Sequence, residues 1–287
     1  MEAIDLESSK VVILTALREE YNAVREQLEE IDEIEENGSI YEQGIFKVDG
    51  QPVARVVIRE CGQGNDKAAQ EVERAIRAFS PLMIFFVGIA GSRKPGDFSV
   101  GDVIVGEKIY FYEGGKDLKG SFKARPDAKS SSNRVIEYAK SIGRGNEWKP
   151  LFKGTENISQ LKGDCGIIAS GAKLIEDVQS HQGAILAEHY NDTQAVEMEG
   201  YGFVNAMSRQ EEAIRIYGVI RGISDILEQG ISDGAEAAVV LHKAAGQDRR
   251  PADTKKLASR TAAAFTFQLV YKIVLAQKKS PLLIRQN

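Results

Sequence analysis

Cysteine and histidine, the residues that most often build disulfide frameworks and zinc sites, are scarce in this chain of 287 residues. Its two cysteines, Cys61 and Cys165, lie far apart, and its three histidines are scattered, at His181, His189 and His242. None of these residues shows the close spacing of metal ligands, and two distant cysteines cannot make a disulfide framework. We therefore expect neither a metal site nor a disulfide-stapled fold.

The chain also lacks a long apolar run. Its longest, residues 82–90, is far shorter than the roughly 18–20 residues that span a bilayer. The first residues, Met-Glu-Ala-Ile-Asp-Leu-Glu, are acidic, whereas a signal peptide begins with basic residues and continues with apolar ones. We expect a soluble protein of the cytoplasm that does not bind membranes.

An excess of positive charge, which nucleic-acid-binding proteins usually show, is missing too. The formal net charge is -5 and the pI is about 5.5, and basic clusters such as Arg249-Arg250 are short. We therefore expect no nucleic-acid partner. Because 43% of the residues are hydrophobic and no long linker interrupts them, the chain is expected to form a single domain over residues 1–287.

Two signatures of nucleotide cofactors are absent from the sequence, namely the dinucleotide fingerprint and the Walker loop. The segment Gly62-Gln-Gly-Asn-Asp-Lys67 is a glycine-rich turn between a predicted strand and a predicted helix. It lacks both the Gly-Lys-Ser/Thr ending and a third spaced glycine. We expect the protein to work without a cofactor.

The sequence does contain a regular alternation of strand and helix patterns. Residues 10–16 form a continuous apolar run, typical of a strand buried on both faces, and residues 17–28 place apolar side chains on one helical stripe. This alternation predicts a three-layer α/β/α domain, with the Gly-, Lys- and Ser-rich residues 113–131 as a flap or surface insertion. The predicted strands are 10–16, 41–48, 51–60, 81–87, 100–105, 108–112, 166–170, 195–199 and 214–223, and the predicted helices are 17–28, 65–79, 132–143, 174–190, 201–210 and 253–276.

The most informative segments are Ala-Val-Glu-Met-Glu-Gly and, further along the chain, Gly-Ile-Ser-Asp. The first places Glu197 and Glu199 on one face of an extended backbone, and the second places Asp225 at the end of an apolar run. A further acid, Glu20, follows the first predicted strand. Because ligands of open α/β sheets collect beyond the carboxyl ends of the strands, we expect these acids to lie together at one edge.

Acids arranged in this way are suited to cutting an N-glycosidic bond. The reaction needs one acid to protonate the departing base, and others to hold the sugar and activate water while an oxocarbenium-like charge develops. We assign proton donation to Asp225, with a pKa raised by an apolar pocket, the ribose hydroxyls to Glu199, and water activation to Glu20. Simpler explanations remain open: a helix-dipole preference for Glu20, a solvent-facing strand position for Glu197 and a helix cap for Asp225.

Seven segments lie in a telling order along the chain: Ala16-Leu-Arg-Glu-Glu20, Gly62-Gln-Gly64, Val87-Gly-Ile-Ala-Gly91, Val100-Gly-Asp-Val-Ile-Val105, Ile168-Ala-Ser-Gly171, Ala195-Val-Glu-Met-Glu199 and Arg221-Gly-Ile-Ser-Asp225. Together they resemble the nucleoside phosphorylase and nucleosidase superfamily, and most closely its 5'-methylthioadenosine/S-adenosylhomocysteine nucleosidases. The resemblance implies a central mixed sheet flanked by helices, a homodimer or larger assembly, and no metal. It also implies a hydrolase that acts on a purine nucleoside or nucleotide, with adenine as the base.

The resemblance gives the site residues specific roles. Glu20 matches the family's water-activating acid, and Met198 and Glu199 match its ribose-contacting pair. Asp225 matches the donor to purine N7, with Ser224 orienting it. The other expected substrate-binding residues are Glu197, Gly88, Ile89, Leu174 and Ile175.

Departures from the family pattern bear on the reaction. Phosphorylases of the family hold phosphate with an arginine just before the Gly-x-x-Gly turn and a serine within it, where this chain has Phe86 and Ile89. Neither side chain can bind an oxyanion, so water is favoured over phosphate as the nucleophile. Leu174 stands where the family has an aromatic residue on the purine face, and it can cover that face with less stacking energy.

Three alternatives stay open. The first is a nucleosidase for 5'-phosphorylated purine nucleotides, because basic side chains of the flap could pair with phosphates. The second is a purine nucleoside phosphorylase, and the third is a nucleoside-sensing module on the same fold, although a mere sensor has no need of a proton donor. The basic residues of the flap are Lys116, Lys119, Lys123 and Arg125.

Overall fold

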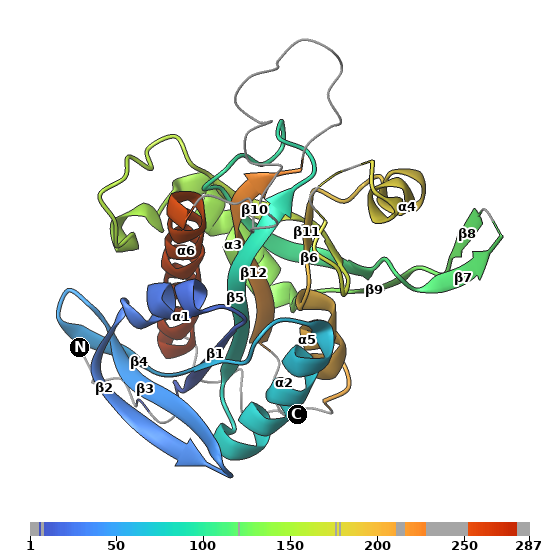
Figure 1. The fold of residues 1–287 in the computed structure, drawn as a ribbon. Coiled ribbons are helices and arrows are strands. Elements are labelled where there is room, and N and C mark those ends of the chain that lie inside the picture. Colours follow the sequence, from blue (N-terminus) through green and yellow to red (C-terminus); the bar gives the residue numbers. More distant parts are fainter. Residues whose placement is uncertain are drawn as a thin grey trace.

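A computed structural model describes residues 6, 9–119, 121–175, 177, 179–210, 216–227 and 252–279. Within these ranges a ten-stranded sheet forms the centre of the molecule and helices lie on both of its faces (Figure 1). The predicted three-layer α/β/α architecture with a central mixed sheet is therefore confirmed. The strands of this sheet are β1 Val11–Thr15, β2 Leu28–Glu36, β3 Ser39–Val48, β4 Gln51–Glu60, β5 Met83–Ser92, β6 Val103–Phe111, β9 Asp127–Lys129, β10 Gly163–Ser170, β11 Ala195–Glu197 and β12 Ile216–Ile226.

The sheet contains two groups of strands that run in opposite directions. Its order is β11-β10-β6-β12-β5-β1-β4-β3-β2, and β9 pairs with β6 outside this path. Strands β4, β1, β5 and β12 are parallel to one another. Strands β6, β10 and β11 are also mutually parallel, but β6 is antiparallel to β12 and β11 is antiparallel to β5.

Alternating side chains of the strands create a hydrophobic core on each face of the sheet. Along β1, Val11 and Ile13 pack in one core, while Val12 and Leu14 pack in the other, because successive side chains of a strand point to opposite faces. The first core includes α1 (Arg18–Arg25), α3 (Asn133–Gly145) and α6 (Ala252–Lys279). The second includes α2 (Asn65–Phe79) and α5 (Gly200–Met207).

The short strand β11 curls the sheet. It pairs with both β10 and β5, so that β5, β12, β6, β10 and β11 form a closed ring of strands. Val196 of β11 lies opposite Gly91 of β5. This curl brings the carboxyl ends of the two oppositely directed groups to one place, which a flat sheet could not do.

Helix α6 is more deeply buried than its sequence pattern predicted. An amphipathic helix was expected over residues 253–276, but residues 261–270 are all buried. The helix approaches the sheet closely because Gly222 of β12 has no side chain, and a Cβ there would collide with the backbone of Ala258. Among the helices that the structure describes, none is both long enough and apolar enough to cross a membrane.

Several elements differ from the predictions, and the strands expected at 100–105 and 108–112 form a single strand, β6. The helix expected over residues 174–190 is wrong in its first part, since α4 spans only His181–His189 and begins where Ser180 accepts a hydrogen bond from the N–H of Gly183 (3.0 Å). Strand β2 was not predicted, because its apolar residues Leu28, Ile31 and Ile34 are spaced three apart among acids, which is a helical spacing.

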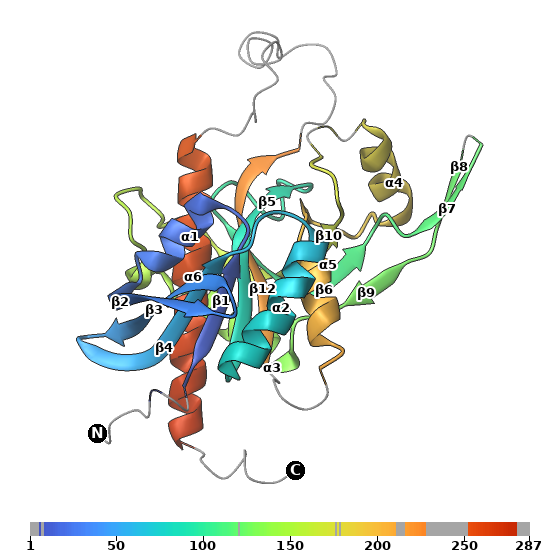
Figure 2. The ribbon, with the colours of Figure 1, turned by 60° about the horizontal axis from the view of Figure 1, so that its bottom comes forward.

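The expected insertion at residues 113–131 consists of a hairpin and a returning strand. Strands β7 (Gly115–Leu118) and β8 (Ser121–Ala124) pair only with each other and project from the body beyond α4 (Figure 2). In β8, the backbone oxygen of Phe122 lies 3.2 Å from Nε2 of His189. The hairpin is therefore attached to α4, and the chain returns to the sheet through β9.

Candidate active site

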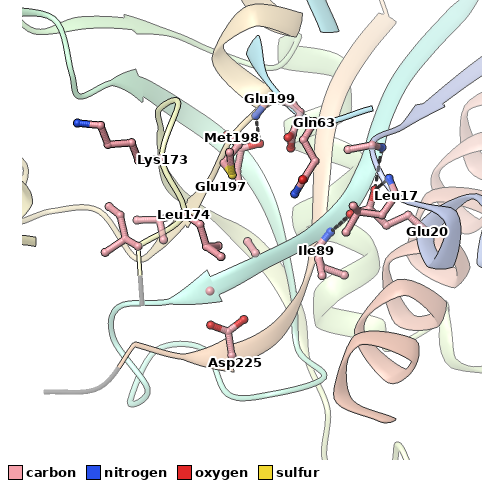
Figure 3. Close-up of a pocket in the computed structure, with 15 residues that line it drawn as sticks. Leu17, Glu20, Gln63, Ile89, Lys173, Leu174, Glu197, Met198, Glu199 and Asp225 are labelled. Carbon is pink, nitrogen blue, oxygen red and sulfur yellow. Dashed lines mark hydrogen bonds between the residues drawn. The ribbon is translucent and has the colours of Figure 1, made fainter. Parts of the chain in front are cut away.

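A pocket lies where the carboxyl ends of β1, β5, β10, β11 and β12 meet (Figure 3). Its lining combines acidic and apolar side chains, as the linings of small-molecule sites usually do. The predicted residues Gly88 and Ser224 do not line it, but each adjoins a residue that does. The predicted site residues that line the pocket are Glu20, Ile89, Leu174, Ile175, Glu197, Met198, Glu199 and Asp225.

Backbone donors hold Glu20 in a fixed position. Its Oε2 accepts hydrogen bonds from the N–H groups of Ala16 (2.8 Å) and Leu17 (2.9 Å), and its Oε1 accepts one from Ile89 (2.9 Å). The residue is only 2% exposed, whereas its neighbour Glu19 is exposed. Glu20 thus caps the start of α1 through Leu17, and the hydrogen bond from Ile89 of β5 also ties its side chain to the pocket that it lines.

Arg221 is the charged residue at the centre of the site. It lies in the middle of β12 with no exposed surface, and its guanidinium sits over the ring of Phe86 at 4.8 Å from the centroid. Its Nη2 donates to Oε2 of Glu197 and, at 3.3 Å, to Oε2 of Glu199. With Glu20 also close, three carboxylates surround one guanidinium, and the ionised cluster carries a net negative charge.

Gly88 forms the gap between Glu20 and Arg221. A Cβ at this position would lie 2.6 Å from Oε1 of Glu20 and closer still to Nη1 of Arg221. Both side chains are held by other hydrogen bonds, so neither can retreat without breaking its contacts. Only glycine leaves room for the carboxylate and the guanidinium to face each other across β5.

We expect Gly88→Ala to lower turnover about 100-fold, because shifting a catalytic group by roughly 1 Å has an effect of that size. The added methyl group would displace Glu20 or Arg221 from the positions described above. Steady-state kinetics would measure the loss. Gly96→Ala is a matched control, since a Cβ on Gly96 meets nothing within 4 Å, and equal turnover in the two variants would contradict the prediction.

Glu197 has a different environment from Glu199. Its Oε2 accepts hydrogen bonds from the N–H groups of Glu199 (3.0 Å) and Gly200 (2.7 Å), at the start of α5. The residue is 7% exposed, so a solvent-facing strand position is ruled out. Both acids line the pocket, but Glu199 accepts its backbone hydrogen bond on Oε1 from the N–H of Gly64 (3.0 Å). Of the two acids, Glu197 is the more occupied by the protein's own donors, and Glu199 is the better placed to receive a ligand.

Asp225 stands at the other side of the pocket and belongs to a strand. It is half-buried, and β12 continues to Ile226, so Asp225 is not a helix cap. The hydroxyl of Ser224 donates to its Oδ1 at 2.5 Å. A Cβ on Gly91 would lie 3.1 Å from its Oδ2, so the lack of a side chain there leaves space beside the carboxylate.

The pocket has two different ends. Lys173 and Leu174 lie at one end, and Leu17 and Gln63 lie at the other, with Met198 between them (Figure 3). Leu174 is 49% exposed, so its apolar surface is available to a flat ligand. None of the flap residues that the structure describes lines the pocket within this chain.

Burial and neighbouring charges shift the pKa values of the acids. Burial raises the pKa of Glu20, although Arg221 and the three backbone donors oppose the shift. Burial likewise raises the pKa of Glu199 to about 7, against the attraction of Arg221 and with the repulsion of Glu197. Both groups therefore exchange protons more readily near neutral pH than ordinary glutamates do.

We expect kcat/KM to fall as the pH is lowered from 8 through the pKa of about 7 of Glu199. A carboxyl with a raised pKa becomes protonated on acidification before an ordinary one does, and a protonated Glu199 accepts ribose hydroxyls poorly. Protonation of Glu20, also with a raised pKa, would lower the rate further. A pH profile between 5 and 9 would show this, and its limb near 7 should vanish from the residual activity of Glu199→Gln. A flat profile down to pH 5 would contradict these assignments.

Sequence patterns did not assign a role to several residues of the site. Arg221, Gln63 and Lys173 were not predicted to take part, although Gln63 and Lys173 line the pocket. A signal for Arg221 was present, because a single charge inside an apolar strand has to be buried with a counter-ion. In the described ranges, no group of three or more His, Cys, Asp or Glu residues is placed to hold a metal ion.

The chain is similar in sequence to known proteins. A family model described as the phosphorylase superfamily matches residues 10–270. An ATP nucleosidase of Escherichia coli, Cap17, is 26% identical over 239 residues, which cover 77% of this chain and 46% of that protein. A 5'-methylthioadenosine/S-adenosylhomocysteine nucleosidase of Oceanobacillus iheyensis is 24% identical over 221 residues, which cover 76% of this chain and 86% of that protein.

The fold has counterparts among solved structures. The 5'-methylthioadenosine/S-adenosylhomocysteine nucleosidase of Neisseria meningitidis, in complex with methylthio-immucillin-A, superposes with a TM-score of 0.66 at 21% identity. The superposition covers 92% of this chain and 99% of that one. By contrast, the chain spans about half the length of the ATP nucleosidase that it matches.

Proposed function

This chain belongs to the phosphorylase superfamily, and from that membership we propose that it hydrolyses the N-glycosidic bond of an adenine nucleoside. One observation carries the proposal, namely that Glu20, Glu199 and Asp225 line a single pocket although they come from distant parts of the sequence. The comparisons confirm the resemblance to nucleosidases that the sequence motifs indicated. The role of each residue is part of the proposal.

In the proposed reaction, water replaces the base at C1' of the ribose. Asp225 donates a proton to N7 of the base, so that the electrons of the broken C1'–N9 bond leave on a neutral adenine. Glu20 accepts a proton from the water whose oxygen bonds to C1'. Glu199 holds the ribose hydroxyls, and the negative cluster around Arg221 stabilises the positive charge that develops on the sugar.

Water is a better nucleophile for this site than phosphate. Phe86 has no exposed surface and lies beneath Arg221, and Ile89 offers the pocket an apolar side chain and binds Glu20 through its backbone. The guanidinium of Arg221 is already surrounded by three carboxylates. A phosphate dianion would be repelled by this cluster, whereas neutral water is not.

The substituent at C5' of the ribose separates two candidate substrates. With the base beside Leu174 and Asp225, and the hydroxyls on Glu199, C5' points to the end of the pocket formed by Leu17 and Gln63. The sequence of this chain resembles the methylthioadenosine enzymes, whose substrates carry a thioether at C5'. We infer a thioether nucleoside as the first candidate, and Leu17 offers it an apolar contact.

A specific observation favours a 5'-phosphorylated adenine nucleotide as the second candidate. Gln63 is polar, and the ammonium of Lys67 would lie 3.1 Å from a Cβ on Gly62, next to Gln63 in the same turn. A lysine there could pair with a phosphate group. The relative from Escherichia coli is an ATP nucleosidase, which supports the same inference.

Release of adenine from a panel of compounds would distinguish these candidates. The panel comprises methylthioadenosine, adenosylhomocysteine, adenosine, AMP and ATP, each with and without added inorganic phosphate. Adenine from the thioethers alone would support the first candidate, and adenine from AMP or ATP alone would support the second. A rate that requires phosphate, with ribose 1-phosphate as product, would show a phosphorylase, and binding without turnover would show a sensing module.

We expect Asp225→Asn to lower kcat on a nucleoside by about 10²–10⁴-fold, the usual contribution of a general acid. Asparagine keeps the shape of the side chain and its contact with Ser224 but supplies no proton to the base. The sharper measurement uses para-nitrophenyl riboside, whose leaving group departs without protonation. Wild type and variant should cleave it at similar rates, and an equal loss on both substrates would show that Asp225 is not the proton donor.

Two further predictions from the sequence remain to be tested in solution. We propose that the protein is a homo-oligomer, and the hairpin β7–β8, which pairs with no other strand of the described chain, is a candidate contact. Sedimentation of the purified protein would measure the oligomer size. We also propose a cytoplasmic location, which fractionation of cells would test.

A further inference from the structure

Asn65 connects the two halves of the pocket without lining it. It is the first residue of α2, directly after Gly64, whose N–H donates to Glu199. Its Oδ1 accepts hydrogen bonds from the N–H of Gly202 (2.7 Å) and from the hydroxyl of Ser170 (3.0 Å). Its Nδ2 donates to the backbone oxygen of Gly171 at 3.4 Å. One amide therefore reaches both β10 and α5, which are distant in the sequence.

The contacts with α5 complete the set of donors at the start of that helix. A helix leaves its first N–H groups without partners inside the helix. In α5, Glu197 accepts from Glu199 and Gly200, Ser170 accepts from Tyr201 (3.1 Å), and Asn65 accepts from Gly202. The backbone on both sides of Glu199 is thus held by side chains of other elements.

The contacts with β10 hold the base end of the pocket. Gly171 follows β10 and leads to Leu174 and Ile175, which line the pocket. Its N–H donates to the backbone oxygen of Glu197 at 3.1 Å, and a Cβ on it would collide with the ring of Tyr112. With Asn65 on its carbonyl oxygen, Gly171 is held on three sides, and the segment that follows starts from a fixed point.

Asn65 does not cap its own helix. Gly64 is the residue at the N-cap of α2, and the side chain of Asn65 bonds only to other elements in the contacts described above. The close approach of α5 to α2 has a further cause, because a Cβ on Gly202 would collide with the backbone of Asn65. The chain has therefore placed a glycine and an asparagine where the two helices meet beside the pocket.

We propose that Asn65, together with Ser170, is a positioning residue that holds the ribose-binding Glu199 and the base-binding segment 171–175 in register with each other. This inference rests on the proposed function. A nucleoside spans both subsites, so its base can lie against Leu174 and its hydroxyls against Glu199 only if the spacing between the two is kept. We call Asn65 and Ser170 the clamp. Without the clamp, the spacing between Glu199 and the segment 171–175 can vary.

The test compares Asn65→Ala and Ser170→Ala with Ser132→Ala, using wild-type protein as reference. Ser132 is a matched control, since its hydroxyl both donates to and accepts from the backbone of Tyr217 (3.1 Å for each bond), at a place that does not line the pocket. We expect each clamp variant to lower kcat/KM by about 10–100-fold, because small misplacements of catalytic groups have effects of this size. Ser132→Ala should lower the melting temperature and leave kcat/KM unchanged.

Binding measurements separate the clamp from the catalytic proposal. A C-nucleoside analogue of adenosine, whose base is joined to the sugar by a stable C–C bond, spans both subsites, whereas adenine alone occupies one. In the clamp variants the affinity for the analogue should fall at least tenfold more than the affinity for adenine. The fold-loss of affinity in the double variant should be smaller than the product of the fold-losses in the two single variants. If the wild-type protein cleaves none of the compounds while the clamp variants still show this binding pattern, that result would support the clamp and contradict the proposed reaction. Equal losses for analogue and adenine, or kinetics like those of Ser132→Ala, would overturn the clamp.

Discussion

Glu20→Gln is expected to lower kcat for glycosidic hydrolysis by about 10³-fold, with substrate binding reduced only slightly. Glutamine is nearly isosteric, but an amide cannot accept the proton that the attacking water must lose, and general-base catalysis contributes about 10²–10⁴-fold. The variant also loses one of its acceptor oxygens, so its amide group would face either the donors at Ala16 and Leu17 or the donor at Ile89. Single-turnover kinetics, which isolate the chemical step, would measure the effect.

Glu19→Gln is the matched control for this experiment. Glu19 precedes Glu20 in the same helical turn, but its side chain is exposed and does not line the pocket. Its removal should leave kcat within about twofold of wild type, since surface substitutions rarely matter. A Glu20→Gln protein that keeps a tenth or more of wild-type kcat would show that the water is activated by another group.

Arg221→Met is expected to lower the free energy of unfolding by about 3–5 kcal/mol at pH 8, the usual result of removing one partner from a buried ionic cluster. Methionine fills part of the space over Phe86, but Glu197 and Glu199 lose the guanidinium that binds them. The three acids would then repel one another in a buried environment. Denaturant titration monitored by fluorescence of the buried Trp148 would measure the change.

Arg221→Met should lower the free energy of unfolding less at pH 5 than at pH 8. Glu20 and Glu199 already have raised pKa values in the folded protein, so acid favours the folded state at these groups and alkali disfavours it. Without Arg221 their pKa values rise further, so more of the destabilisation disappears on acidification. Arg25→Met is the control, because its ion pair with Glu42 is exposed and should contribute less than about 1 kcal/mol at either pH. A loss that does not depend on pH would show that packing, rather than charge, is what Arg221 provides.

The sequence was sufficient to predict the buried strands but not the curl of the sheet. Strands β1 and β5 are apolar on both faces, which leaves a continuous run that is visible in the sequence. Strand β2 was missed because its partner β3 gives it a strand conformation that its acid-rich sequence does not demand. The pairing of β11 with two strands depends on contacts between distant segments, and no local pattern encodes it.

The residues of the site were easier to predict than their relations to one another. The acids were visible because Glu197, Glu199 and Asp225 stand in segments whose neighbours are apolar. The distinct environment of Glu197, which binds the start of α5, could not be predicted because its partners are backbone groups in a particular geometry. Arg221 and Asn65 act on several elements at once, so their contacts became apparent only when those elements were placed together.

The three carboxylates around Arg221 also determine what kind of inhibitor the pocket should favour. A sugar mimic with a protonated ring nitrogen carries a permanent positive charge at the position where the substrate is positively charged only in the transition state. Because burial raises the pKa of Glu199 to about 7, its negative charge near the pocket grows as the pH rises through neutrality. As long as the amine stays protonated, such a compound should therefore bind more tightly on the alkaline side, whereas a neutral mimic of the same shape should gain little.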